Sequence, residues 1–308
     1  MSDESGSDDR GDTVEVIERS RRRLINLAYR MLGSLADAED VVQETYVRWY
    51  TMSRTEQEAI ETPDAWLTTV ASRLCLNVLR SARVRRETYV GEWIPEPVPE
   101  SDVWSESRSL GVGTDPADRI TLDESINMAF LVVLESMTPA ERVAFTLHDV
   151  FCYSFAEVGE IVGRTPGACR QLASSARRRI RESRTPATPS AQQAGIIREF
   201  KEAWEAGDID SLVGLLAPDV TATSDGGGRV STLLHPVVGA DKIVDAFVRL
   251  KNVFGDLTIL ERTVNGQPGL IAQRDGVTVS VYAFELEGAL IKHIWTIRNP
   301  EKLRSWRE

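Results

Sequence analysis

The stretch FAEVGEIVGRTPGACRQLASSARRRIRESR, residues 155–184, decides the fold of the middle of the chain. Apolar residues at helical spacing in its first eight positions predict one helix, and the following Gly-Arg-Thr-Pro predicts a short turn before a second helix. Thr165 can cap this second helix, and Pro166 suits its first turn because a missing backbone N–H costs nothing there. Two helices joined in this way indicate a helix-turn-helix.

The second of these helices is strongly basic. Between Arg164 and Arg184 there are seven arginines and one acidic residue, Glu182. Guanidinium and amide groups on such a helix suit contacts with base edges and phosphates in the major groove of DNA. The alternative is a helix pair with a solvated basic face. The candidate DNA contacts are Arg164, Thr165, Arg170, Gln171, Ser174, Arg177 and Arg178.

Charge is unevenly distributed along the chain. The 308 residues carry a net charge of -11, which by itself argues against nucleic-acid binding. Residues 136–190 nevertheless hold eight Arg or Lys and five Asp or Glu, whereas residues 87–135 hold two and eleven. The helix-turn-helix therefore forms the cationic block of an acidic protein, as local DNA binding requires.

Composition limits the class of protein. An apolar content of 42% and a charged content of 27% are typical of a soluble globular protein, and no apolar run reaches membrane-spanning length. The polar, acidic N-terminus does not resemble a signal peptide, so we expect a cytoplasmic protein. The widely separated Cys75, Cys152 and Cys169 predict reduced thiols and no metal site.

The first 86 residues predict three helices. Apolar periodicity predicts helices over residues 14–32 and 36–51, followed by a polar run at 53–61. Thr62 and Pro63 then begin a helix that ends in an arginine-rich segment near Arg86. The second of the three helices presents a polar, mostly acidic face, which a solvated surface alone also explains.

Two stretches of the chain resemble a known family. DAEDVVQETYVRWY (37–50) followed by TPDAWLTTVASRLCLNVLRSAR (62–83) resembles region 2 of extracytoplasmic-function sigma factors, and residues 137–181 resemble their region 4. The resemblance implies that the chain binds core RNA polymerase, reads the -35 promoter element through region 4 and holds the melted -10 element in region 2. Many members have Arg-Asn where this chain has Ser72-Arg73, so the base preference at -10 is left open.

The resemblance also implies two groups of site residues in region 2. A charged face of the second helix would dock on the polymerase, and the loop at 53–63 with the basic face of the third helix would hold a flipped base and the phosphates of single-stranded DNA. The implied polymerase contacts are Asp37, Asp40, Gln43, Glu44, Arg48 and Trp49. The implied -10 contacts are Arg73, Asn77, Arg80 and Arg83.

Residues 87–135 read as an acidic connection. Pro95, Pro97 and Pro99 and nine net negative charges predict that most of it is extended rather than packed, until helical periodicity returns at 122–134. In the resembling family such a linker threads the polymerase near its active site and RNA exit. A flexible acidic spacer between domains is the alternative.

A third domain follows a Pro/Ala/Ser linker. A helical stretch beginning at Ile196 is followed by short strands with one further helix at 241–251, which predicts an α+β cone around a curved antiparallel sheet. This part resembles the SnoaL-like domains of the nuclear-transport-factor-2-like fold. The expected domains are 1–12, a disordered acidic N-terminus; 13–88, region 2; 89–120, an acidic linker; 121–184, region 4; 185–194, a second linker; and 195–308, the SnoaL-like domain.

The cone raises the alternative of an enzyme. A general base needs a carboxylate or imidazole inside an apolar cavity, and the sequence does not place one there. We therefore expect no catalytic residues, no cofactor and no metal, and leave open whether the cone binds a small molecule. The groups considered for catalysis are Asp219, Asp225, His235, Arg274, Tyr282, His293 and Trp295.

Three short motifs resemble a group of these sigma factors that carries SnoaL-like extensions. They are WIPEP at 93–97, DGGGR at 225–229 and NPEKL at 299–303. The resemblance implies that the extension modulates its own sigma factor in cis, and we hypothesise that the 225–229 loop contacts the 93–97 motif. The implied regulatory residues are Trp93, Pro95, Glu96, Pro97, Asp225, Gly226, Gly227, Gly228, Arg229, Asn299, Pro300, Lys302 and Leu303.

The expected function is promoter recognition with core RNA polymerase. One alternative is a helix-turn-helix regulator that does not bind polymerase. The other is a ligand-sensing or catalytic cone fused to a DNA-binding module.

Overall fold

The computed structural model describes residues 8–86, 89–100, 126–183, 188–254 and 257–307. These form two compact units. Of the described residues, the first combines 8–82 and 137–177, and the second combines 83–86, 89–100, 126–136, 178–183, 188–254 and 257–307. No helix among the described residues is both long and apolar enough to cross a membrane.

Four helices begin the first unit: α1 (Asp8–Leu32), α2 (Leu35–Thr51), α3 (Arg54–Glu58) and α4 (Pro63–Arg86). The expected polar run at 53–61 contains the short helix α3 rather than only a loop. Ser53 and Glu56 form a capping box, in which each side chain accepts a hydrogen bond from the other's backbone N–H. Local capping thus gives helical structure to a segment without an apolar face.

The second part of this unit confirms the helix-turn-helix. Helix α6 (Pro139–Phe145) continues into a π-helical turn, η4 (Thr146–Val150), and α7 (Phe155–Val162) precedes α8 (Pro166–Ser183). Gly163 ends α7 with a φ of 73°, a left-handed conformation that glycine adopts without strain. The Thr165 hydroxyl accepts a hydrogen bond from the Ala168 N–H at 3.2 Å and caps α8 as predicted.

The second unit has the expected α+β architecture, with helices beside one sheet. Its elements are α5 (Met128–Glu135), α9 (Ser190–Ala206), α10 (Ile209–Gly214), β1 (Leu216–Asp225), β2 (Val237–Val238), α11 (Ala240–Phe254), β3 (Thr258–Val264), β4 (Gln267–Arg274), β5 (Val277–Glu287), β6 (Leu290–Ile297) and the 3-10 turn η5 (Arg304–Trp306).

The strands form one mixed sheet in the order β2-β1-β6-β5-β4-β3. The expectation of an antiparallel sheet is wrong at one place, because β1 pairs with β6 in parallel. Strand β2, helix α11 and strands β3, β4 and β5 lie between β1 and β6 in sequence, and this length allows the return that a parallel pair needs. Helix α9 begins at Ser190, inside the linker expected at 185–194, and the disordered segment expected at 1–12 lies partly outside the described residues.

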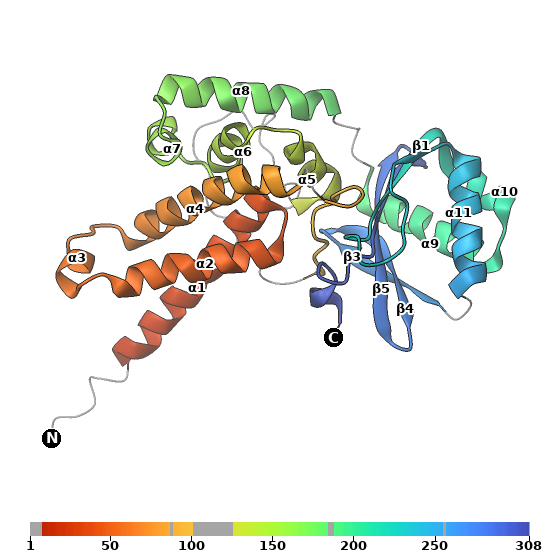
Figure 1. Cartoon of the computed structure of the whole chain (residues 1–308), viewed down its shortest axis with the longest axis horizontal. Coiled ribbons are helices and arrows are strands. Elements are labelled where there is room, and N and C mark those ends of the chain that lie inside the picture. Colours follow the sequence, from red (N-terminus) through yellow and green to blue (C-terminus); the bar gives the residue numbers. More distant parts are fainter. Residues whose placement is uncertain (1–7, 87–88, 101–125, 184–187, 255–256, 308) are drawn as a thin grey trace. The chain divides into compact units, whose positions relative to one another are not determined.

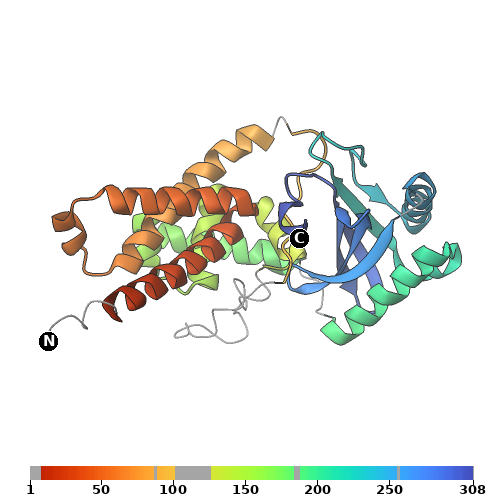
Figure 2. The same cartoon turned by 90° about the horizontal axis from the view of Figure 1, so that it is seen from below.

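The sheet has a separate apolar core on each face. Helices α9 and α11 lie on one side of the sheet in both views, and the C-terminal end lies on the other (Figures 1 and 2). The helical side contains an aromatic cluster in which the Trp204 and Tyr282 ring centroids are 5.4 Å apart and those of Trp204 and Phe247 are 4.9 Å apart. The opposite side packs Ile94, Trp295 and Trp306 together.

Part of the acidic connection is packed, contrary to expectation. Ile94 and Val98 are each only 1% exposed, and Pro99 forms an isolated antiparallel bridge with Val264 at the end of β3. The segment is extended, as its prolines require, but its apolar side chains lie in the second core of the sheet. The net negative charge of the connection predicted a solvated segment, because a sum over the whole connection conceals its few buried apolar residues. Linker residues 101–125 lie outside the described part of the chain.

A half-buried histidine makes the stability of the second unit depend on pH. His293 contacts the Thr223 hydroxyl at 2.9 Å and stacks on Trp295, and burial lowers its pKa from the usual 6.5 to about 4. Below pH 6.5 the unfolded chain therefore binds a proton at His293 that the folded chain does not bind. The free energy of unfolding decreases as the pH falls from 6.5 to about 4. Because one pKa unit is worth about 1.4 kcal/mol, the loss is on the order of 3 kcal/mol.

His293→Gln is expected to remove this part of the pH dependence. Urea unfolding of the variant and the intact chain between pH 4 and 7 measures it, with exposed His235→Gln as the control. Identical pH profiles for His293→Gln and the intact chain would contradict the assignment.

Candidate functional site

Helix α8 presents the predicted DNA face to solvent. Cys169, Ala173 and Ala176 are buried and fix which side of the helix packs inward. The opposite side of α8 carries polar residues at helical spacing. The exposed members of the candidate set are Arg164, Thr165, Arg170, Gln171, Ser174 and Arg178.

Arg177 differs from the rest of the set. Its guanidinium donates to the Asp149 carboxylate at 2.9 Å, and its side chain is 24% exposed. Arg170 instead extends over the Phe155 ring, with 5.3 Å between the guanidinium carbon and the ring centroid, and stays exposed. Arg170 is therefore free of a carboxylate in the described structure at a position near the start of α8, where recognition helices contact bases.

Helix α4 carries the predicted -10 face. Arg73, Asn77 and Arg80 are exposed and lie at spacings of four and three residues, so they share one side of the helix. Ser72 is buried, and the guanidinium of Arg73 donates to the backbone carbonyl of Glu160 in α7 at 3.0 Å. The side chain of Arg83 lies outside the described part of the chain.

Helix α2 carries the predicted polymerase face. Asp40, Gln43, Glu44 and Arg48 are exposed, and Asp37 and Trp49 are half-buried. Glu44 and Arg48 pair at 2.8 Å across one helical turn. Charged side chains at this exposure can steer a partner of complementary charge.

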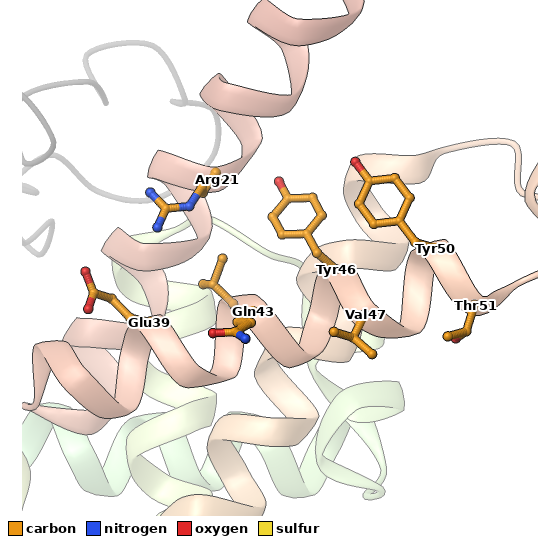
Figure 3. A pocket seen from close by; sticks show the side chains of 8 residues that line it. Arg21, Glu39, Gln43, Tyr46, Val47, Tyr50 and Thr51 are labelled. Carbon is orange, nitrogen blue, oxygen red and sulfur yellow. The ribbon is translucent and has the colours of Figure 1, made fainter.

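A groove of about 630 Å³ lies beside this face, between α1 and α2. Figure 3 shows the rings of Tyr46 and Tyr50 side by side along α2, and their centroids are 6.2 Å apart. Tyr50 is 61% exposed and Val47 is 49% exposed. Burial, the largest cause, raises the pKa of Tyr46 to about 12. The groove combines an exposed apolar surface with the polar ends of Arg21, Glu39 and Gln43.

In the second unit, the Asp225 carboxylate joins its own loop to two distant segments. Its Oδ1 accepts hydrogen bonds from the Tyr89 hydroxyl at 2.6 Å and from the Gly227 N–H at 3.0 Å. Its Oδ2 accepts from the Ile94 N–H at 3.0 Å and from the Lys302 ammonium at 2.6 Å. Asp225 is fully buried, so these four donors replace its hydration.

Lys302 completes this arrangement, which we call the Asp225 clasp: Tyr89, Ile94, Asp225, Gly227 and Lys302. Its ammonium also donates to the Ile94 carbonyl and lies 4.0 Å from the centroid of the Trp93 ring. Lys302 is 9% exposed, so its charge is stabilised mainly by the carboxylate and the ring face. Burial, and to a smaller extent the hydrogen bond to Asp225, raises the pKa of Tyr89 above its usual value.

The glycines of the 225–229 loop allow this close packing. Gly227 has a φ of 61°, and a Cβ atom there would overlap the Asn299 side chain. Gly228 has a φ of 67°, and a Cβ atom would lie 3.0 Å from Val90. Arg229, at the end of the loop, pairs with Glu301 at 2.6 Å.

Two further contacts hold the linker against the cone. The Trp306 indole N–H donates to the Pro97 carbonyl at 2.9 Å. Asn265, which is fully buried, accepts from the Val98 N–H at 3.1 Å and donates to the Ile126 carbonyl at 2.9 Å. The 93–98 segment is therefore fixed at both ends by backbone hydrogen bonds.

The groups considered for catalysis lie at several places in the described structure, although His293 and Trp295 stack on each other. Asp225 is in the clasp, Tyr282 is in the aromatic cluster and His293 contacts Thr223. Asp219 pairs with Lys292 at 2.6 Å, and His235 is exposed. Trp295 packs on the linker side of the sheet.

Comparison with known proteins matches residues 16–85 to the family model for Sigma-70 region 2 and residues 127–180 to the model for Sigma-70, region 4. The ECF RNA polymerase sigma factor SigJ of Mycobacterium tuberculosis is 37% identical over 303 residues, which cover 94% of this chain and 92% of the relative. The chain belongs to the extracytoplasmic-function sigma factors.

The similarity to these relatives extends over nearly the whole sigma factor, including its C-terminal unit. The probable ECF RNA polymerase sigma factor SigI of M. tuberculosis is 35% identical and covers 95% of each chain. The crystal structure of SigJ aligns with a TM-score of 0.72 at 36% identity, over 95% of this chain and 98% of that one. The sigma factor therefore binds core RNA polymerase and directs initiation at promoters, and its relatives are sigma factors rather than enzymes.

Sequence reasoning missed several residues that hold the sigma factor's linker. Tyr89, Asn265 and Trp306 lie outside the three motifs yet bind the linker or Asp225. A tryptophan in the otherwise polar stretch 304–308 was an available signal for Trp306. Asn265 precedes Gly266 and reads as a turn residue, which conceals its buried role. Sequence reasoning also assigned no binding role to the groove tyrosines of α2, Tyr46 and Tyr50.

Proposed function

We propose that the sigma factor reads the -35 element with α8 and the -10 element with α4, and that its C-terminal unit modulates this activity in cis by binding the linker. The Asp225 clasp supports the proposal most directly. It joins the 89–94 segment to a loop of the cone and to the 299–303 motif through a single carboxylate. The relatives support cytoplasmic action together with RNA polymerase.

The linker position matters because it connects the two promoter-reading domains. A domain tethered on the same chain acts at high effective concentration, so it can hold a linker without a separate partner protein. Residues 94–98 are buried against the cone, so this part of the connection is held by the C-terminal unit. Releasing the clasp lengthens the free connection and changes which spacing of promoter elements can be spanned.

Contacts within the first unit suggest a second level of control. Arg73 of the -10 face donates to the Glu160 carbonyl, and Arg23 donates to the Tyr153 hydroxyl at 2.8 Å. This hydrogen bond uses one of the five N–H donors of the guanidinium and fixes its orientation. We propose that Arg73 turns from the Glu160 carbonyl toward a DNA phosphate when the -10 strand binds.

Arg170→Ala is expected to weaken promoter binding more than Arg177→Ala. A bidentate base contact is worth about 1–3 kcal/mol, whereas Arg177 is already paired with Asp149. Filter binding of holoenzyme to promoter DNA at several salt concentrations measures the affinity and its salt slope. Exposed Arg198→Ala in α9 is the control. Equal affinities and slopes for Arg170→Ala and the intact chain would refute the DNA assignment.

Tyr50→Ala is expected to weaken core polymerase binding. Aromatic residues at the centre of an interface cost about 2 kcal/mol or more when truncated, and Tyr50 is the exposed ring of the α2 groove. Titration of labelled polymerase with each variant measures Kd, with Val277→Ala, an exposed apolar residue of the cone, as the control. Unchanged polymerase affinity would exclude the groove from the interface.

Run-off transcription with core polymerase tests the proposed function as a whole. The intact chain, a chain without residues 299–308 and a chain without residues 191–308 are compared on a promoter library. We expect all three to direct transcription and to differ in promoter preference or output. Identical activity refutes cis modulation. Binding of promoter DNA without stable association with core polymerase favours the independent helix-turn-helix regulator instead.

A further inference from the structure

A pocket of about 270 Å³ lies in the second unit, beside the end of β4, the start of β5 and the segment that follows β6. It is separate from the clasp residues, although both involve the segment 298–307. One part of its lining is apolar. The apolar side chains are Val230, Leu250, Leu257, Val277, Val279 and Leu303.

The other part of the lining is cationic. Arg274 ends β4, Arg298 follows β6 and Arg307 follows η5, so three separate segments bring guanidinium groups to one pocket. The nearly buried hydroxyl residues Thr278 and Ser280 line it as well. No Asp or Glu is among the described residues of the lining. Arginine forks with nearby hydroxyl donors match the planar oxygens of a carboxylate.

The position of Arg298 is well defined. Its guanidinium donates to the Ser231 carbonyl at 2.5 Å, and Arg307 donates to the Pro300 carbonyl at 3.1 Å. Burial lowers the pKa of Arg298, whereas the nearby Tyr282 raises it and the positive charge of Arg274 lowers it. Arg298 and Arg274 therefore both present guanidinium groups at a pocket where water is partly excluded.

We propose that this pocket binds a small carboxylic acid with an apolar body. Its carboxylate contacts Arg298 and Arg274, and its body lies against Leu250, Leu257 and Val279. At about 30 Å³ for each water, the volume corresponds to about nine waters, the size of an acid with about nine non-hydrogen atoms. Benzoate has this size and shape and serves as the probe.

The site is connected to the clasp along the chain. Arg298, Pro300 and Leu303 line the pocket, and Lys302 between them binds Asp225. An occupant that orders this segment therefore stabilises the clasp, since less conformational entropy is lost when Lys302 binds. This regulatory consequence rests on the proposed cis modulation, whereas binding itself does not.

Isothermal titration calorimetry on the full chain tests the site with benzoate, benzamide and inorganic phosphate. We expect saturable 1:1 binding of benzoate and at least tenfold weaker binding of benzamide, which has the same shape but no charge. Arg298→Gln and Arg274→Gln should each weaken benzoate binding at least tenfold. Arg262→Gln, an exposed arginine on β3 of the same sheet, should leave it unchanged. Arg274 is exposed, so its variant tests the site even where Arg298→Gln disturbs folding.

Several results would overturn the proposal. They are no saturable benzoate binding, equal binding of benzamide, equal weakening by Arg262→Gln, or phosphate binding tighter than benzoate binding. Hydrogen exchange of the Ile94 amide with and without benzoate tests the link to the clasp, and exchange that does not slow overturns that link. None of these measurements uses polymerase or DNA, so their failure is distinct from a failure of promoter recognition.

Discussion

Asp225→Asn is expected to raise the exchange rate of the Ile94 amide by roughly 10²–10⁴-fold. Removing one partner of a buried ion pair costs about 3–5 kcal/mol, because Lys302 then remains charged and nearly buried without its carboxylate. The Asn side chain also presents donors where Asp225 accepted from four groups. Hydrogen exchange followed by mass spectrometry measures opening of the linker, and urea unfolding measures the stability of the chain.

Two comparisons isolate the clasp. Asp219→Asn removes an exposed carboxylate that also pairs with a lysine, Lys292, and little change is expected because solvent screens that pair. Lys302→Met leaves Asp225 with three neutral donors, so its cost should be smaller than that of Asp225→Asn. The double variant gives the coupling energy of the pair. If Asp225→Asn exchanges no faster than Asp219→Asn, the clasp does not hold the linker.

Trp306→Ala is expected to destabilise the second unit by about 3–5 kcal/mol and to release the linker. Its indole is 7% exposed, packs in the core on the linker side of the sheet, and donates to the Pro97 carbonyl. The variant thus loses packing and leaves a buried carbonyl without its donor. Exchange of the Val98 amide and run-off transcription report the release.

Trp306→Phe separates packing from hydrogen bonding. The smaller phenyl ring keeps part of the apolar contact but leaves the Pro97 carbonyl without its donor, so a cost of about 1–3 kcal/mol is expected, below that of Trp306→Ala. Promoter-specific transcription should also change more in Trp306→Ala than in Trp306→Phe. An unchanged Val98 exchange rate in Trp306→Ala would show that the C-terminal segment does not restrain the linker.

Local signals predicted the helical domains well. The turn around Gly163 and the Thr165 cap of α8 depend on residues only a few positions apart, and both are present in the structure. The α+β class of the C-terminal unit also followed from the change in apolar periodicity. Arg73, Asn77 and Arg80, which the family resemblance implied as -10 contacts, lie on one exposed face of α4.

Long-range partners were less accessible to sequence reasoning. Nothing near Arg177 reveals that Asp149 will bind it, and nothing near β1 reveals its parallel partner β6. The buried linker was missed for a similar reason: its acidic composition dominated the interpretation, whereas Ile94 and Val98 determine where it packs. The motif resemblance did point to contact between the 225–229 loop and the 93–97 segment, and Asp225 makes that contact with Ile94.

The sequence distances within the clasp determine the order of events during synthesis. Lys302 binds the Ile94 carbonyl across 208 residues, and Trp306 binds Pro97 across 209. At about 5–20 residues per second, a ribosome takes roughly 10–40 s to make the intervening chain. During that interval both promoter-reading domains emerge while the groups that fasten their connection do not yet exist. In each newly synthesised chain the linker is therefore unrestrained until the C-terminal segment has been made.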